Sequence, residues 1–202
     1  MVSATNILTE AQAAVGGAVG RLGWTYSSGT TTNNIDPVNF KGDFCRLYNL
    51  LVEGVFRYSQ ASTENEPMTL RLVVVQLTRS RATDATTDDI FRRSNTALDD
   101  NTIQGNAIAV FGPLQDGVSS IGRILLDRRY MLQPGHRETV RVRFNLRGLS
   151  NYRRDTHGLG DVSSEGVPQG RIYVFYGVSY NGGQDADVAQ LVLNAKLAYP
   201  DN

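Results

Sequence analysis

The chain has 202 residues, of which 20 are basic and 20 acidic, and its formal net charge is zero. This length suits one all-β domain that can fold without a disulfide, and the single cysteine excludes an internal disulfide framework or a cysteine-based zinc site. Neutrality argues against a free-standing nucleic-acid binder and favours association with other molecules. No apolar run has the ~20 residues that a membrane span needs, and the N-terminus lacks the pattern of a signal peptide.

The first 39 residues differ in composition from the rest. An alanine- and valine-rich run could make one short helix capped by Thr9, with a flexible arm as the alternative. Residues 25–34 are polar and typical of a linker. We therefore predict an N-terminal arm over residues 1–39, which includes the only tryptophan, Trp24, and a β domain over residues 40–202.

From residue 40 onward, strand-like segments follow one another. Residues 70–77 are almost continuously apolar, as expected of a central strand that is covered on both faces. Gly54 interrupts an earlier segment and predicts a bulge or bend. The predicted strands, in chain order, are residues 44–58, 70–77, 108–111, 124–132, 140–147, 171–180 and 189–199.

The most regular pattern lies between Ile121 and Gly148. Pro134 and Gly135 form a turn signal between two strand-like runs. We predict a long antiparallel hairpin, with one face of its second strand in the core and the other outside. The predicted inner residues are Val140, Val142, Phe144 and Leu146, and the predicted outer ones are Thr139, Arg141, Arg143, Asn145 and Arg147.

One short helix is expected in the long excursion between residues 78 and 117. Thr86 or Thr87 would cap it, and Asp88 and Asp89 would lie near its N-terminus. Seven to nine mostly antiparallel strands with one minor helix predict a β-sandwich or barrel in a single domain.

Catalytic and metal-binding patterns are weak. The two histidines, His136 and His157, lie in a turn and a loop, and no nucleophile elbow or phosphate-binding loop occurs. We therefore expect no enzyme activity and no cofactor. The acidic pairs are weak calcium candidates and are more typical of helix starts and turns: Asp88, Asp89, Asp99 and Asp100.

Arginine is the informative residue type, because 18 of the 20 basic residues are arginine. Residues 121–160 hold nine arginines and three acids, a balance of 9 − 3 = +6, so the remainder carries 11 − 17 = −6. Three interpretations stay open: a solvated strand face that resists aggregation, complementary contacts between subunits, or contact with nucleic acid. The candidate residues for such contacts are Arg128, Arg129, Arg141, Arg143, Arg147, Arg153 and Arg154, with Phe91, Arg92 and Arg93 as further candidates for an inter-subunit contact.

Several landmarks together resemble a known family. They are Phe40-Lys-Gly-Asp-Phe-Cys-Arg, the apolar strand from Leu70 to Leu77 with its Thr-Arg-Ser exit, Thr87-Asp-Asp-Ile-Phe, the pair of strands beginning at Ile124 and Val140, and Gly170-Arg-Ile-Tyr-Val-Phe-Tyr. In this order they resemble the single jelly-roll capsid proteins of small icosahedral viruses. The nearest types are circular single-stranded DNA viruses and plant satellite viruses.

This resemblance implies an eight-stranded antiparallel jelly-roll sandwich. It also implies a virion shell of sixty copies or a multiple, made in the host cell, with the chain itself as main partner, no membrane, and no catalytic residues. Such proteins usually begin with an arm rich in basic residues that binds the single-stranded genome, and no such arm is present here. From the residues alone, a jelly-roll carbohydrate-binding module or lectin is the alternative, and a β-sandwich hydrolase is a third.

Overall fold

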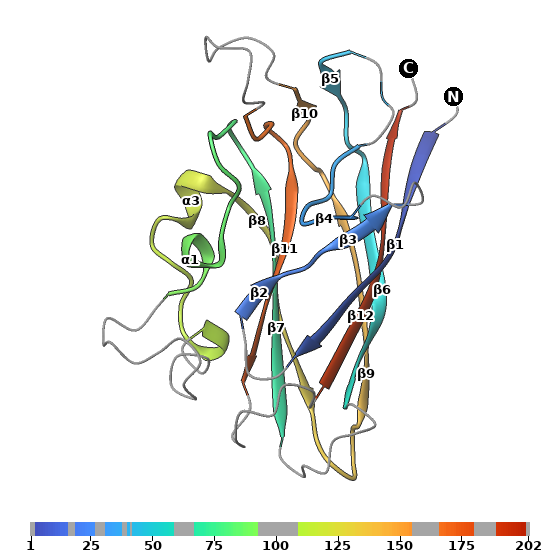
Figure 1. Ribbon diagram of the computed structural model, residues 1–202, viewed down its shortest axis with the longest axis vertical. Coiled ribbons are helices and arrows are strands. Elements are labelled where there is room, and N and C mark those ends of the chain that lie inside the picture. The colour runs from blue at the N-terminus through green and yellow to red at the C-terminus, as the bar shows by residue number, and fades with distance from the viewer. Residues whose placement is uncertain are drawn as a thin grey trace.

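The computed structural model describes residues 3–15, 19–26, 31–37, 40, 42–58, 67–92, 109–154, 166–179 and 189–200. Within them, ten strands form two facing antiparallel sheets, and eight of these strands make the jelly-roll sandwich that the resemblance implies (Figure 1). The six-stranded sheet has the order β4 (Thr31–Thr32), β3 (Trp24–Tyr26), β1 (Ser3–Val15), β12 (Ala189–Pro200), β6 (Asn49–Tyr58) and β9 (Thr139–Arg147). The four-stranded sheet has the order β2 (Val19–Arg21), β11 (Ile172–Ser179), β7 (Met68–Leu77) and β8 (Gly122–Leu132).

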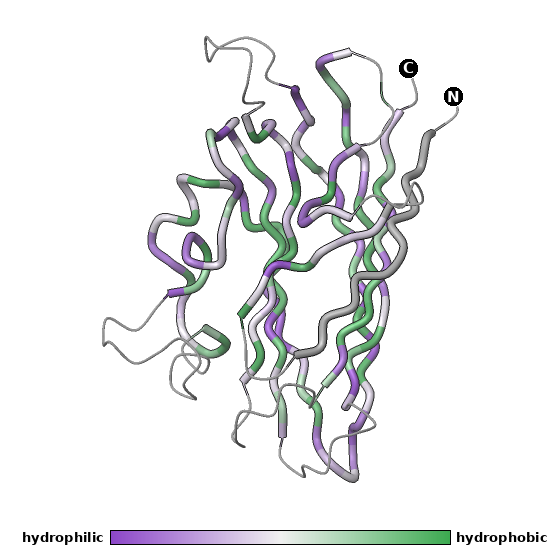
Figure 2. The backbone as a smooth tube through the Cα atoms, in the orientation of Figure 1, coloured by the Kyte–Doolittle hydropathy of each residue, from purple (hydrophilic) through white to green (hydrophobic). Residues whose placement is uncertain are grey.

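The main core lies between the two sheets. In β9, Val142 and Phe144 are buried and Val140 packs against the same core, while Arg141 and Arg143 are exposed. The alternation predicted for this strand is therefore confirmed. In Figure 2, hydrophobic and hydrophilic segments follow one another along the strands of the two sheets. The last strand, β12, alternates in the same way.

A second core covers the outer face of the four-stranded sheet. Every residue of β7 is buried, as predicted for a central strand covered on both faces. Its outward residues pack against Ile90 of helix α1 (Thr87–Ile90) and Val118 of helix α3 (Val118–Ile121). Helix α1 is the predicted one, and its Thr86 backbone N–H donates to the Asp89 carboxylate over 2.9 Å as a capping interaction.

Two arginines attach the chain between β7 and β8, which covers this sheet and which we call the covering segment, to the strands beneath it. Arg71 of β7 donates to both carboxylate oxygens of Asp127, at 2.8 and 2.6 Å, and to the carbonyls of Ala109 and Gly112. Arg129 of β8 donates to the carbonyl of Val110 over 2.7 Å. The guanidinium groups thus satisfy carbonyls around the helical turn 109–111, where the sequence predicted a strand.

The predicted hairpin is wrong. The chain does reverse at the turn after β8, where Gln133 and Arg137 form an isolated bridge. However, β8 pairs with β7 and β9 pairs with β6, so the two strands are edge strands of different sheets. Turn chemistry specifies a reversal of the chain, whereas the choice of sheet depends on partners far away in sequence.

The predicted N-terminal arm is also wrong, because residues 1–39 supply strands to both sheets. Strand β1 pairs with β12 from Ser3↔Pro200 to Val15↔Ala189, with one register shift, where a helix or flexible segment was predicted. Trp24 is fully buried in the main core, and β4 and the last two residues of β3 lie in the segment predicted as a linker. The sandwich therefore begins well before residue 40.

Gly54 makes no bulge, since its pairing with β9 and β12 is continuous. A Cβ atom there would lie 1.9 Å from the carbonyl oxygen of Val192, so the glycine instead permits close approach of two strands. A search of the described residues finds no helix with the length and apolarity to cross a membrane.

Candidate interface on the open face of the six-stranded sheet

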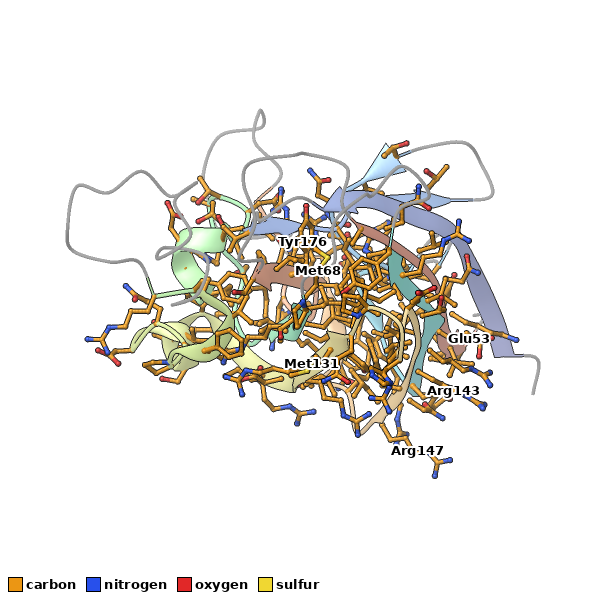
Figure 3. The ribbon with its side chains drawn as sticks, turned by 90° about the horizontal axis from the view of Figure 1, so that it is seen from below. Glu53, Met68, Met131, Arg143, Arg147 and Tyr176 are labelled. Atoms are coloured by element: carbon orange, nitrogen blue, oxygen red, sulfur yellow. The ribbon has the colours of Figure 1, made fainter. Side chains whose placement is uncertain are left out.

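The outer face of the six-stranded sheet is built by alternation in three neighbouring strands. The register pairs Glu53 of β6 with Arg143 of β9 and with Asn194 of β12, so these side chains share one face. Figure 3 shows Glu53, Arg143 and Arg147 gathered on one side of the sandwich and directed away from it. The side chains of Arg141 and Arg143 are 69% and 60% exposed.

This surface, which we call the open face, is basic. Its outward positions on β6, β9 and β12 contain five cations and one acid, a balance of 5 − 1 = +4. The cations are Arg57, Arg141, Arg143, Arg147 and Lys196, and the acid is Glu53. Only the charges on these three strands enter this balance.

Glu53 neutralises little of this charge. Its carboxylate lies 3.8 Å from the Arg141 Nη2 atom and 3.8 Å from the Arg143 Nε atom, at exposed positions. Such exposed pairs usually contribute less than about 1 kcal/mol, because water screens them. The two guanidinium groups therefore keep most of their capacity to bind an external carboxylate or phosphate.

The open face also has a shallow depression and an apolar component. Glu53, Gly54, Arg141 and Asn194 contribute to the lining of the depression. Leu51, Val55 and Val192 are outward residues that are only half buried. A surface that combines free cations with partly exposed apolar side chains is suited to contact with a macromolecule.

The seven predicted contact arginines do not form one patch. Arg141, Arg143 and Arg147 lie together on the open face, whereas Arg153 and Arg154 lie at or beside the short strand β10 (Tyr152–Arg153). Arg128 and Arg129 lie on β8 in the other sheet. Arg129 is occupied by the carbonyls of residues 110 and 111.

The second predicted contact group fails at its central residue. Phe91 is 3% exposed and belongs to the second core, so its side chain is not available to a neighbour. Arg92 is exposed, and Arg93 lies outside the described residues. An aromatic residue flanked by arginines suggested a surface anchor, but its burial depends on the distant residues that cover β7.

Two of the four weak calcium candidates lie within the described residues. Asp88 lies on the exposed surface of α1, and Asp89 caps that helix and lies 3.3 Å from Arg81. Asp99 and Asp100 lie outside the described residues. Across the described part of the chain, no three metal-ligating side chains come together as a candidate ion site.

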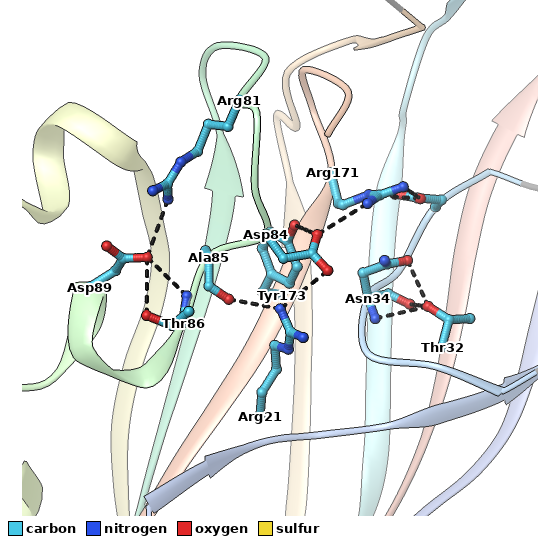
Figure 4. Close-up of polar contacts among 11 residues, drawn as sticks. Arg21, Thr32, Asn34, Arg81, Asp84, Ala85, Thr86, Asp89, Arg171 and Tyr173 are labelled. Atoms are coloured by element: carbon cyan, nitrogen blue, oxygen red, sulfur yellow. Dashed lines mark hydrogen bonds and ion pairs between the residues drawn. The ribbon is translucent and has the colours of Figure 1, made fainter. Parts of the chain in front are cut away.

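Another charged cluster lies at the border between the N-terminal strands and the second core (Figure 4). Arg171 lies 2.7 Å from Asp36 and 3.2 Å from Asp84, and Tyr173 donates to Asp84 over 2.6 Å. Burial raises the pKa of Asp36 against the opposing effect of Arg171, and burial with the Asp84 hydrogen bond raises the pKa of Tyr173. These groups connect Arg21 of β2, which donates to the Ala85 carbonyl, to the rest of the fold. The cluster is structural.

Sequence reasoning missed Arg57 and Lys196 as members of the open face. Each lies at an outward position of an alternating strand, so the alternation of β6 and β12 contained the necessary signal. What was missing was the strand order that places β12, β6 and β9 side by side. No protein-family model and no curated protein matches this chain.

Proposed function

We propose that the chain is a structural coat protein that self-assembles into a closed shell around a small viral genome. The observation that carries the proposal is the strand order of the sandwich, with β1-β12-β6-β9 facing β2-β11-β7-β8. A single jelly roll in this arrangement is the building block implied by the resemblance in sequence.

The contrast between the two outer faces supports the same proposal. The four-stranded sheet is covered by the chain's own helices, whereas the open face has a balance of +4 in a protein with zero net charge. In an isolated module these arginines would only protect the edge strand β9 from pairing with another chain. A shell subunit can use them to bind a neighbour's acids or packaged nucleic acid.

Assembly would join many modest interfaces. Each would bury roughly 800 Å² per partner or less, and closure of the shell makes their combined effect strong. The buried positions of Tyr173 and Phe175 give no aromatic platform on β11, which is the feature that a sugar-binding sheet would need. The coat-protein proposal therefore takes precedence over the lectin alternative.

Electron microscopy of the purified full chain tests the proposal. We expect uniform closed particles, which after nuclease treatment either retain protected nucleic acid, seen in the ratio of absorbance at 260 and 280 nm, or are empty. Arg128→Glu is a suitable control for a charge-reversal variant of the open face, such as Arg141→Glu with Arg143→Glu, because this exposed arginine lies outside that face. A monodisperse monomer at high concentration would refute the proposal.

A further inference from the structure

The end of the sandwich where β5 (Phe44–Cys45) and β10 meet has two different sides. On the inner side, Cys45, Leu47 and Tyr152 are buried in the main core, and Tyr152 stacks edge-on against Phe40 with ring centroids 5.5 Å apart. These contacts fix the backbone of the short ladder.

The outer side carries the alternate residues, and they are aromatic and basic in turn. Phe44 is 55% exposed and Tyr48 is 38% exposed, whereas most large apolar side chains of the described residues are buried. Arg46, between them in sequence, is exposed and lies over the Tyr48 ring at 5.8 Å from its centroid. Arg153 is the direct cross-strand partner of Phe44 and is also exposed.

The charge around this group favours an anion. On the outer side, Arg46 and Arg153 outnumber Asp43, the acid next to Phe44, whereas Arg154 lies 4.4 Å from the centroid of the Phe40 ring, on the side where Phe40 packs against Tyr152. Arg147, at the end of β9, is paired with Asn49, the residue after Tyr48, so the basic open face leads to this end of the sandwich.

We infer that Phe44, Arg46, Tyr48 and Arg153 form a platform that binds single-stranded nucleic acid. The aromatic rings offer faces on which unpaired bases stack, and the arginines between them bind the phosphates that join those bases. Aromatic rings and arginines also occur together at protein–protein interfaces, so contact with a second copy is the competing outcome that the experiment below distinguishes. A duplex cannot use the rings, because its bases are already stacked and paired.

The platform goes beyond the coat-protein proposal and does not depend on shell formation. Binding to the full chain is measured by fluorescence anisotropy with a labelled 20-nucleotide thymidine oligomer, and with a duplex of equal length, at several salt concentrations. The oligomeric state is recorded by light scattering in the same samples, so a failure of the platform and a failure of assembly are separate results.

We expect the single strand to bind at least tenfold more tightly than the duplex. Phe44→Ala and Tyr48→Ala should each weaken single-strand binding by roughly 5- to 150-fold, the range for loss of one stacked base, with the salt dependence retained. Arg46→Ala and Arg153→Ala should each make the negative slope of log affinity against log salt shallower by about 0.7. Phe44→Tyr should restore binding.

Phe111→Ala is the matched control, because Phe111 is 56% exposed but lies on the covering segment of the other sheet. It should bind the oligomer as the parent chain does. Equal binding of duplex and single strand, or unchanged affinity in both aromatic variants, would overturn the inference. So would variants that alter particle formation with unchanged affinity, because the rings would then contact a second copy.

Discussion

The outer faces of the two sheets are built in opposite ways. Over the four-stranded sheet, the chain between β7 and β8 returns to cover β7, and Arg71 and Arg129 hold it there through backbone carbonyls. Over β6, β9 and β12, the arginines instead point outward with only Glu53 among them. The same residue type serves as an internal fastener on one face and as a free charge on the other, and only the surrounding partners distinguish the two roles.

Strand β9 gives the sharpest test, because its two faces have opposite environments. Val142→Asp should abolish folding, since it places an unpaired charge at a position that is fully buried in the main core. Circular dichroism and solubility of the expressed chain check this. Arg143→Asp, one residue along, should fold normally, and a folded Val142→Asp protein would contradict the assignment of the faces.

Arg71→Ala tests whether Arg71 holds the segment between β7 and β8 against the sheet. The substitution leaves Asp127 without its bidentate partner and removes the donors to the carbonyls of Ala109 and Gly112, so it should cost about 3 kcal/mol in the free energy of unfolding. Urea denaturation measures the change. Arg128→Ala, an exposed arginine on the neighbouring strand, should change the same quantity by less than about 0.5 kcal/mol.

The free charges are tested by the double variant Arg141→Glu, Arg143→Glu. Its free energy of unfolding should stay within about 1 kcal/mol of the parent, because both side chains are exposed. Particle yield or nucleic-acid content should fall strongly, since the open face changes from +4 to 0. Electron microscopy and absorbance report these quantities, and parental yield with parental content would contradict the role of the open face.

The charged cluster around Arg171 and Asp36 gives the smallest expected effect on stability. Burial raises the pKa of Asp36 above its ordinary 3.8, so the folded chain holds this proton more tightly than the unfolded chain does. The contribution of Asp36 to stability is then greatest at low pH and is lost as pH rises through its raised pKa. Thermal unfolding at pH 3.5 and at pH 7 tests this. The stability of Asp36→Asn relative to the parent chain should be higher at pH 7 than at pH 3.5. A constant difference would contradict the shift.

Alternation and apolar runs were sufficient to predict β7, β9, β11 and β12, because each strand's own sequence records which faces are buried. The pairing of β1 with β12 was not predictable, since its alanine-rich second half resembles a weak helix and only pairing with the edge of β12 selects the strand. The partners of β8 and β9 were likewise misassigned, because a turn fixes direction but not the sheet.

The candidate site, like the fold, was predicted only in part. Arg141, Arg143 and Arg147 were identified from one strand, but Arg57, Lys196 and the Phe44–Tyr48 platform require the packing of distant strands. Arg129 and Phe91 show the reverse case, in which residues that looked like surface anchors serve the chain's own second core.

The most direct test of the account is a cryo-electron microscopy map of purified particles at side-chain resolution. The account predicts a closed shell in which Arg141 and Arg143 contact either the acidic side chains of a neighbouring copy or density of packaged nucleic acid. Failure to form particles, or a shell in which both arginines face only solvent, would contradict it.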